Sequence, residues 1–567
     1  GRRRPVAGIE IDTGGGLDPE AVRRVMALAR PRSFGRRPWF RSDLFEADRR
    51  AIEALLRLSG RYRGRLAVYE AVPGEAGVTI RVRIDPGPVA TLAEVALEGA
   101  RAIPREALLA GVATGGPLKL AEVRDLRRRI LKRYRARGFL EAQVSTRLEP
   151  LGGGRWRLAI RVREGVAARV GATHLRGLTR THPEVVWREL AYRRGDPLDP
   201  ALLARSRQAL VRLGLFERVA VEPDPLLAGA AVRDVVVSVD EGKQGEAAWS
   251  IGFGSEENLR TAVEISHRNP FGHNRPISFL ARLSSLERTL FLSGREPRLF
   301  GSHTAAVVNL VQARRRFENF TKTTIGTAAL LERELLPRVH GSLGFQYDNA
   351  SLSDISGEVR VTDADAGRIG LASGIASLFW DRRDNPLDPS RGFLLGTDLQ
   401  WSTALLLSER DFLKVGLQAA AYLTPRPGWT TAFGLRTGTI LPTRGGQTIP
   451  IQVRYFLGGP STLRAFHQDE LAGDDPEQLG GISFLLFNLE ERFPLYRRLR
   501  GVLFSDVGNV FARRDPFSPL AGLRTTAGLG LRIRTPVGPL RLDYGVKLNR
   551  RAGESRGELH FSLGQAF

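Results

Sequence analysis

The chain has 567 residues, 42% of them hydrophobic and 26% charged, which is the composition of a folded protein with more than one domain. No stretch approaches the roughly 20 apolar residues of a membrane-spanning helix, which excludes a helical membrane protein but not a barrel of strands. The absence of cysteine excludes disulfides and thiolate metal sites. Gly1 opens onto three arginines without an apolar stretch, so we expect a mature or trimmed form.

The net charge of +24 comes largely from arginines that are spread over the chain. Nucleic-acid binding usually gathers such charge on a basic helix, a zinc module or an aromatic-basic platform, and we identify none of these in the sequence. We therefore expect no nucleic-acid partner. Solvated faces and a basic barrel lumen explain the charge better, and anionic lipid head groups are a further contact to consider.

The first half of the chain is an internal repeat. A helix in each unit ends close to an aromatic residue, and Tyr62, Phe139 and Phe216 stand 77 residues apart. Each unit closes with a strand that runs into a charged turn at a glycine. These closing glycines lie 78 and 77 residues apart, at Gly87, Gly165 and Gly242. A spacing kept through three units indicates three copies of one small fold.

The second copy shows the order of elements. A strand at 89–97 leads to helices near 104–110 and 120–134, and two alternating strands follow at 142–148 and 156–162. We therefore predict β-α-α-β-β units, each a small sheet covered by two helices. The expected boundaries of the three units are 1–87, 88–165 and 166–243.

Residues 244–567 read as strands and turns. Residues 540–549 alternate between a wholly apolar face and a polar one. Because no helices remain to cover the apolar face, either a second sheet or a membrane must do so. About 320 residues at roughly 20 per strand and connection give around sixteen strands, as in a closed transmembrane barrel. The alternative is a soluble β-sandwich that binds a ligand.

One stretch carries a specific family resemblance. Residues 453–466 read Val-Arg-Tyr-Phe-Leu-Gly-Gly-Pro-Ser-Thr-Leu-Arg-Ala-Phe. They resemble the tip of the long sixth extracellular loop in the BamA/TamA outer-membrane assembly superfamily, whose periplasmic repeats are called POTRA domains. Arg464, Ala465 and Phe466 match the arginine-glycine-aromatic motif of that loop, with alanine in place of the usual glycine. The resemblance implies three POTRA domains followed by a 16-stranded antiparallel transmembrane β-barrel, and the number of repeats is most like the TamA branch.

In such proteins the motif arginine reaches acidic residues on the inner barrel wall, and the matching positions here are Glu490 and Asp506. A charge-assisted bond can hold a loop inside a lumen, where an unpaired arginine would be costly. The alternative is an ordinary Gly-Gly-Pro loop with a solvated arginine.

The end of the chain and two turns also fit a barrel. Residues 559–567 alternate and end at Phe567, which resembles the C-terminal signal that barrel-assembly machinery reads on outer-membrane proteins. The turns at 268–272 and 380–393 are rich in asparagine, aspartate, proline and glycine, and we expect them to set strand register.

We expect the first barrel strand, at about 246–255, to pair with the last, at about 557–567. The resemblance implies that this seam is a lateral gate. Its expected residues are Trp249, Ser250, Ile251, Gly252, Phe561, Ser562, Leu563 and Gly564. Glycines weaken strands, so those in the seam favour opening. Cysteines at Ser250 and Ser562, moved to neighbouring positions if the register differs, would test this gate.

The resemblance implies a non-enzymatic factor of the bacterial outer membrane, with its N-terminal domains in the periplasm, that inserts or translocates client polypeptides through the gate. The implied partners are unfolded outer-membrane clients, outer-membrane lipid and an inner-membrane-anchored protein of the TamB type bound through the POTRA domains. A dedicated polypeptide secretion channel of the two-partner type and a passive pore are the alternatives. We expect no cofactor or metal: enzyme motifs are not found, and residues 362–367 begin like a calcium loop but lack its later ligands.

Overall fold

The computed structural model describes residues 4–29, 38–355, 367–444, 448–473, 479–512, 522–535 and 538–563. The chain divides into two compact units. One holds residues 1–177, 189–212 and 218–240, and the other holds the remainder, including everything from residue 241 onward. Within the described ranges, every helix is too short or too polar to cross a membrane.

Three copies of one β-α-α-β-β arrangement precede the barrel. In each sheet the third strand lies in the centre, and the first strand pairs with it in parallel. The first copy comprises β1 (Val6–Asp12), α1 (Pro19–Val25), α2 (Ser42–Leu58), β2 (Arg65–Gly74) and β3 (Gly77–Asp85), with the short helix η1 (Ala27–Ala29). The second comprises β4 (Thr91–Glu98), α3 (Arg105–Leu109), α4 (Leu120–Arg135), β5 (Gln143–Gly152) and β6 (Arg155–Arg163). The third comprises β7 (Arg169–Arg176), α5 (Pro183–Trp187), α6 (Pro200–Arg212), β8 (Phe216–Pro223), η3 (Pro225–Leu227) and β9 (Val232–Glu241).

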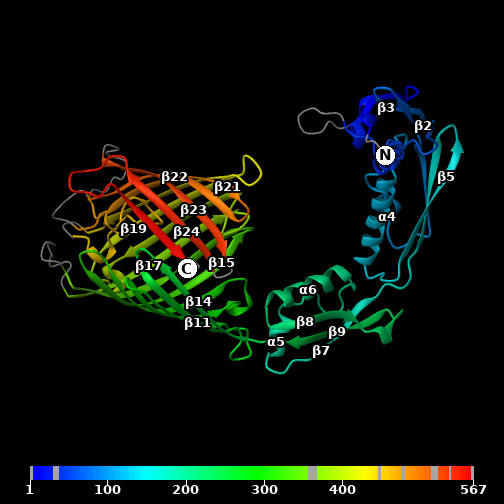
Figure 1. Ribbon diagram of the computed structural model, residues 1–567. Coiled ribbons are helices and arrows are strands. Elements are labelled where there is room, and N and C mark those ends of the chain that lie inside the picture. The colour runs from blue at the N-terminus through cyan, green and yellow to red at the C-terminus, as the bar shows by residue number, and fades with distance from the viewer. Residues whose placement is uncertain are drawn as a thin grey trace. The chain divides into compact units, whose positions relative to one another are not determined.

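The second copy shows why these residues fold this way. Helix α4 buries Val123, Leu126, Ile130 and Tyr134, which recur at helical spacing along one face. They pack in one core with alternate residues of β6, and Figure 1 shows the helix beside the strands of its sheet. Seven basic residues of α4 are exposed on its other faces, so the sequence-based view that the chain has no basic helix is wrong.

The charged turn that closes a repeat holds another loop of the same repeat. Glu164 accepts hydrogen bonds from the backbone N–H groups of Arg101 (2.6 Å) and Ala102 (2.8 Å) and from the hydroxyl of Tyr134 (2.8 Å). At the equivalent position 77 residues later, Glu241 accepts from the backbone N–H of Thr181 (2.8 Å) and the hydroxyl of Thr179 (2.7 Å). One carboxylate thus satisfies several donors in each of these two loops.

Consecutive repeats are joined by the same backbone hydrogen bond. The N–H of Ala90 donates to the carbonyl of Gly60 at 2.8 Å, and the N–H of Ala168 donates to the carbonyl of Gly138 at 2.9 Å. Both glycines have positive φ, at 76° and 89°. The 78-residue offset between the two bonds shows that the joint itself is repeated.

Sixteen strands form a closed barrel in which each strand pairs with its neighbours in the sequence, and the last returns to the first (Figure 1). The first eight are β10 (Gly245–Gly254), β11 (Asn258–His267), β12 (Ile277–Leu283), β13 (Glu287–Glu296), β14 (Ala305–Arg316), β15 (Thr321–Leu336), β16 (Val339–Ser353) and β17 (Arg368–Asp381). The others are β18 (Gly392–Ser402), β19 (Phe412–Leu423), β20 (Thr430–Pro442), β21 (Ser483–Tyr496), β22 (Leu499–Phe511), β23 (Arg524–Thr535), β24 (Gly538–Lys547) and β25 (Gly557–Leu563). Three short helices, η4 (Leu299–Gly301), η5 (Ala404–Leu406) and η6 (Ile451–Val453), lie in the connections.

The outer face of the barrel is apolar. On β10, for example, Trp249, Ile251 and Phe253 are exposed, and the alternate residues between them are small. This period of two is typical of strands with lipid on one side and a polar lumen on the other. The predicted fold class, three small α/β sheets followed by a 16-stranded antiparallel barrel, is confirmed.

The predicted turn at 268–272 contacts the segment that follows β7. Asn269 donates from its side-chain amide to the hydroxyl of Thr181 at 3.1 Å, and the carbonyl of Gly272 accepts from the N–H of His182 at 2.9 Å. The rings of His182 and His273 stack with centroids 4.0 Å apart. This turn therefore does more than set strand register.

Candidate functional site

The connection between β20 and β21, residues 443–482, is the sixth at the end of the barrel where β10 turns into β11, and we call it loop six. Its described residues fold into the lumen. Leu457, Leu463, Ala465 and Phe466 form a buried cluster with residues of the barrel wall. A connection of this length stays ordered only if the wall supplies partners for its polar groups.

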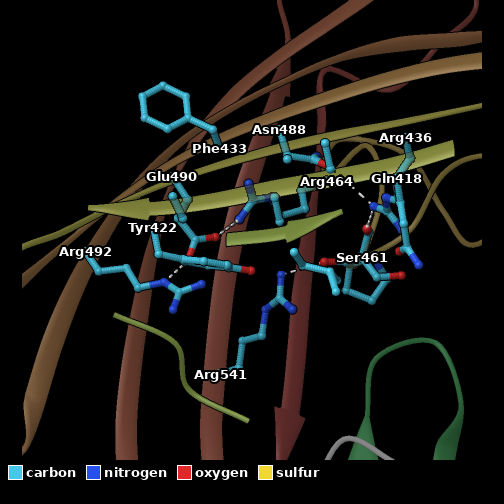
Figure 2. Close-up of a pocket in the computed structure, with 16 residues that line it drawn as sticks. Gln418, Tyr422, Phe433, Arg436, Ser461, Arg464, Asn488, Glu490, Arg492 and Arg541 are labelled. Atoms are coloured by element: carbon cyan, nitrogen blue, oxygen red, sulfur yellow. Dashed lines mark hydrogen bonds and ion pairs between the residues drawn. The ribbon is translucent and has the colours of Figure 1, made fainter. Parts of the chain in front are cut away.

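Arg464 provides the strongest of these contacts. Its Nε and Nη2 donate to the two oxygens of Asp506 at 2.9 and 2.7 Å. Its Nη1 donates to Glu490 at 2.6 Å (Figure 2). Its backbone N–H also donates to Asp506, at 3.1 Å. The guanidinium lies over the ring of Phe504, 3.6 Å from the centroid. With only 4% of its side chain exposed, the arginine is satisfied by a fork geometry that lysine cannot reproduce.

Asp506, which is fully buried on β22, is held by further donors. The amide of Asn488 donates to it at 2.8 Å, and the same amide donates to the carbonyl of Thr462 in loop six at 2.8 Å. The structure therefore brings together the three charged residues that the sequence singled out. It adds Asn488, which sequence reasoning missed.

The other two motif residues lie deeper in the lumen. Phe466 is 1% exposed, and its ring lies beneath the cations of Arg524 and Lys547, at 4.8 and 4.3 Å from the centroid. Ala465 is fully buried and is not among the residues with positive φ, so its backbone does not require glycine. A glycine is required on the barrel wall instead. At Gly545 of β24, which packs against the motif, a Cβ would lie 2.2 Å from the carbonyl oxygen of Arg464.

Further cations of the wall bind loop six, mostly at backbone carbonyls. Lys322 and Lys414 donate to the carbonyls of Gln452 and Val453 at 2.7 and 2.9 Å. The other contacts are Arg436 to the carbonyl of Ser461, Arg541 to the carbonyl of Pro460, Lys547 to Glu470 and Arg315 to Asp469. The only signal in the sequence is a basic residue at a lumen-facing strand position, which does not reveal its acceptor.

The seam between β10 and β25 is described as far as Leu563. Within that range its register pairs Phe253 with Leu563 and Gly254 with Ser562. Trp249, Ser250, Ile251 and Gly252 pair with β11 but with no described residue of β25. Phe561 adds one hydrogen bond, from the N–H of Ser255 to its carbonyl at 2.9 Å.

The register also corrects the expected crosslinking pair. Gly254, rather than Ser250, lies opposite Ser562, because the two strands are staggered where the tilted barrel closes. Gly564 and Phe567 lie outside the described residues, as does most of the calcium-like stretch at 362–367.

A polar cluster lies at the end of this seam. Glu256, in the turn after β10, is 3.2 Å from Nδ1 of His560 on β25, and its other oxygen accepts from the N–H of Gln468 in loop six at 3.3 Å. His467 of loop six lies 3.7 Å from Glu256 and 3.2 Å from Glu558. Loop six thus contacts both sides of the seam.

A closed antiparallel barrel with an apolar outer face and a loop bound in its lumen, preceded by small α/β repeats, defines a transmembrane barrel of the outer-membrane type. Residues 269–567 match the Omp85 superfamily domain, and residues 90–165 and 168–242 match the POTRA family, described as a surface antigen variable number repeat. The chain belongs to the Omp85 superfamily. It is an outer-membrane β-barrel protein with periplasmic N-terminal POTRA domains.

The chain is 25% identical over 574 residues to the outer membrane protein assembly factor BamA of Nitratidesulfovibrio vulgaris, covering 97% of this chain and 72% of that protein. It is 21% identical over 494 residues to BamA of Neisseria meningitidis serogroup B, covering 77% of this chain and 62% of that protein. The crystal structure of BamA from Haemophilus ducreyi lacking POTRA domains 1–3 shares the fold, with a TM-score of 0.72 at 17% identity, covering 84% of this chain and 99% of that one. These relatives are named BamA and not TamA.

Proposed function

We propose that the protein assembles outer-membrane proteins by inserting client polypeptides at the seam between β10 and β25. The observation that carries the proposal is the occupied lumen: Arg464 of loop six binds Asp506 and Glu490 inside the barrel, so a client has to pass through the wall. Strands β10 and β25 meet where the barrel closes and are not joined by a hairpin, so separating them leaves two free edges. A client strand can add to such an edge by β-augmentation.

Loop six counts against the alternatives of a secretion channel or a passive pore. Arg464 and the wall cations hold the loop across the lumen at many points along its length. A polypeptide that crossed the lumen would have to displace these contacts together. Opening the seam leaves these contacts in place and affects loop six at Glu256 and Glu558.

Unfolded outer-membrane polypeptides are the partners that this function requires, and outer-membrane lipid meets the seam directly. Strands β10, β11 and β12 have ten, ten and seven residues, against sixteen for β15, so the apolar band is shorter on the β10 side of the seam. A bilayer adapts to a short apolar band by thinning. A TamA-type role with a TamB-type partner is not part of the proposal, because the relatives compared above carry the name BamA.

A disulfide across the seam tests the gate. A Cβ placed at Gly254 lies 3.8 Å from the Cβ of Ser562, within the roughly 3.5–4.5 Å of natural disulfides. The chain has no other cysteine, so Gly254→Cys with Ser562→Cys gives one defined crosslink. We expect the oxidised protein to stop inserting a client barrel into liposomes and the reduced protein to insert it normally.

The matched control locks a strand pair that has no need to open. Thr323 faces Ser351 in the long ladder between β15 and β16, so Thr323→Cys with Ser351→Cys crosslinks the wall elsewhere. This control should insert clients whether oxidised or reduced. Full activity with the seam locked would overturn the proposal and favour transport through the lumen.

A further inference from the structure

We propose that the lumen contains a binding site for a small oxyanion, a carboxylate or phosphate group, beneath the tip of loop six. A cavity of about 330 Å³ lies between the tip at Pro460 and Ser461 and the inner faces of five strands. Its charged lining consists of Arg436, Arg464, Arg492, Arg541 and Glu490. Figure 2 shows the guanidinium groups of Arg436 and Arg541 on either side of Ser461, whereas the ring of Phe433 points away. This site goes beyond the proposed function and does not depend on it.

The ion pairs around the cavity leave positive charge uncompensated. Arg464 and Arg492 share Glu490, Arg464 also takes Asp506, and Arg541 shares Asp543 with Arg532. Arg492 and Arg500 reach Asp388 at 3.6 and 3.9 Å. With Arg436, the network has six guanidinium groups and four carboxylates. The groups are Arg436, Arg464, Arg492, Arg500, Arg532 and Arg541, against Asp388, Glu490, Asp506 and Asp543.

Arg436 is the centre of the excess. No carboxylate of the described residues lies within ion-pair distance of it, and its bonds run to neutral acceptors: the carbonyl of Ser461 and the side-chain oxygen of Asn488 at 3.3 Å. Both bonds use the same nitrogen, Nη2, although a guanidinium carries five N–H donors. Arg541 uses Nε for Asp543 and Nη2 for the carbonyl of Pro460. Each arginine therefore has donors left for a ligand in the cavity.

The chemistry of the lining selects the ligand. Unshared guanidinium donors in a partly enclosed space favour an anion with two or more oxygens, since such a group accepts parallel N–H bonds. Gln418, Tyr422 and Asn488 supply neutral polar groups around it. A free phosphate ion and the terminal carboxylate of a polypeptide share this chemistry, and both fit the volume. The anion would neutralise Arg436 and contact the same carbonyl-bound arginines that hold the tip of loop six.

The first experiment measures phosphate binding to the purified full chain in detergent by isothermal titration calorimetry, in a buffer that contains chloride as its only anion. We expect saturable binding at one site. Arg436→Gln should weaken it by roughly tenfold or more, because a hydrogen bond to a charged group is lost along with the excess charge. Arg295→Gln is the matched control, since Arg295 pairs with Glu332 on another part of the wall, and it should bind phosphate like the wild type.

A second measurement guards against misfolding of the variant. Phosphate should raise the thermal unfolding temperature of the wild-type protein above that in chloride of equal ionic strength, and this effect should be absent in Arg436→Gln and Arg541→Gln. Two competition experiments then distinguish the two possible ligands, a polypeptide C-terminus and a free phosphate ion. Competition with phosphate by a short peptide with a free C-terminal carboxylate, but not by its amidated form, identifies a polypeptide terminus as a ligand; competition by neither identifies free phosphate. Absence of saturable binding in the wild type, or equal binding in Arg436→Gln and Arg295→Gln, would overturn the proposal.

Discussion

At the scale of single residues, Arg464 joins loop six to two strands at once. Its Nε and Nη2 bind Asp506 while its Nη1 binds Glu490. Removing the side chain therefore leaves two buried carboxylates without this partner. Breaking a buried pair from one side typically costs about 3–5 kcal/mol. The exposed pair of Arg295 and Glu332 offers a comparison, because such pairs contribute about 0–1 kcal/mol.

We therefore predict that Arg464→Ala lowers the unfolding temperature of the purified protein and exposes residues 448–473 to protease, while Arg295→Ala does neither. Arg464→Lys should have effects between those of the wild type and Arg464→Ala, since lysine keeps the charge but cannot form two parallel hydrogen bonds with one carboxylate. Thermal unfolding and limited proteolysis in detergent measure both effects. Equal behaviour of Arg464→Ala and Arg295→Ala would show that the motif arginine does not fix the loop.

Glu241 is a second residue with a measurable contribution to folding stability. Burial acts to raise the pKa of this carboxyl, but hydrogen bonds from Thr179, Thr181 and Arg180 outweigh it and lower the pKa to about 2. A pKa that is lower in the folded state contributes stability above the unfolded value, near 4.3, and this stability is lost as the pH falls toward 2.

We predict that Glu241→Gln is less stable to urea than the wild type at pH 7, and that the difference shrinks as the pH falls from about 4.5 toward 2. Urea denaturation of the full chain at several pH values checks this. Glu222→Gln, on the exposed side of β8, is the control and should show no such trend. A difference that stays constant down to pH 2.5 would contradict the role given to the Glu241 carboxylate.

At the scale of elements, the end of the seam is held by ionisable side chains from three places. Glu256 comes from the turn after β10, Glu558 and His560 from β25, and His467 from loop six, while Asp543 of β24 stands opposite His560 in the ladder. Burial acts to raise the pKa of Glu256, but bonds and charges from His560, Gln468 and His467 outweigh it and keep that pKa below its usual range. The carboxylate is therefore charged at neutral pH, where it joins the turn after β10 to β25 and to loop six.

Removing the Glu256 carboxylate should loosen this end of the seam. We predict that the amides of Ser255 and Phe561 exchange faster in Glu256→Gln than in the wild type, because the contacts of Glu256 with His560 and Gln468 weaken. His340→Gln, on β16, is the control and should leave their exchange unchanged. Hydrogen exchange followed by mass spectrometry provides the measurement. Equal exchange in Glu256→Gln and in the wild type would exclude the cluster as a constraint on the seam.

At the scale of the whole molecule, the two halves were predictable for different reasons. The repeats are recognised by their fixed spacing, and the barrel strands by the local alternation of apolar and polar residues. A single sequence is enough to detect both patterns. The meeting of Arg464 with Glu490 and Asp506 was predictable only through the family resemblance, because these residues lie on separate elements. The partner of Ser562 across the seam was not predictable. The stagger between β10 and β25 is set by closure of the entire barrel, and no local sequence pattern encodes it.

The net charge of +24 has a structural explanation that composition could not supply. Part of it lies on the barrel wall, where Lys322, Lys414 and Arg436 donate to carbonyls of loop six. Another part lies on the exposed face of α4. A backbone carbonyl leaves no trace in the sequence, so a cation bound to one looks like any other solvated charge.

The repeated joint between periplasmic units makes the arm modular in length. The hydrogen bond from Ala168 to Gly138 is equivalent to the one from Ala90 to Gly60, one period further along the chain. Removing residues 88–165 would join Gly87 to Val166. Ala168 would then take the place of Ala90 and could bond to Gly60. The shortened protein should fold, since each remaining repeat keeps its own core, and circular dichroism with thermal unfolding would check this. Deleting residues 88–175 instead, ten residues more than one period, should abolish folding because it removes most of β7 and breaks the phase. Evolution could thus lengthen or shorten such an arm by whole periods without redesigning either neighbour.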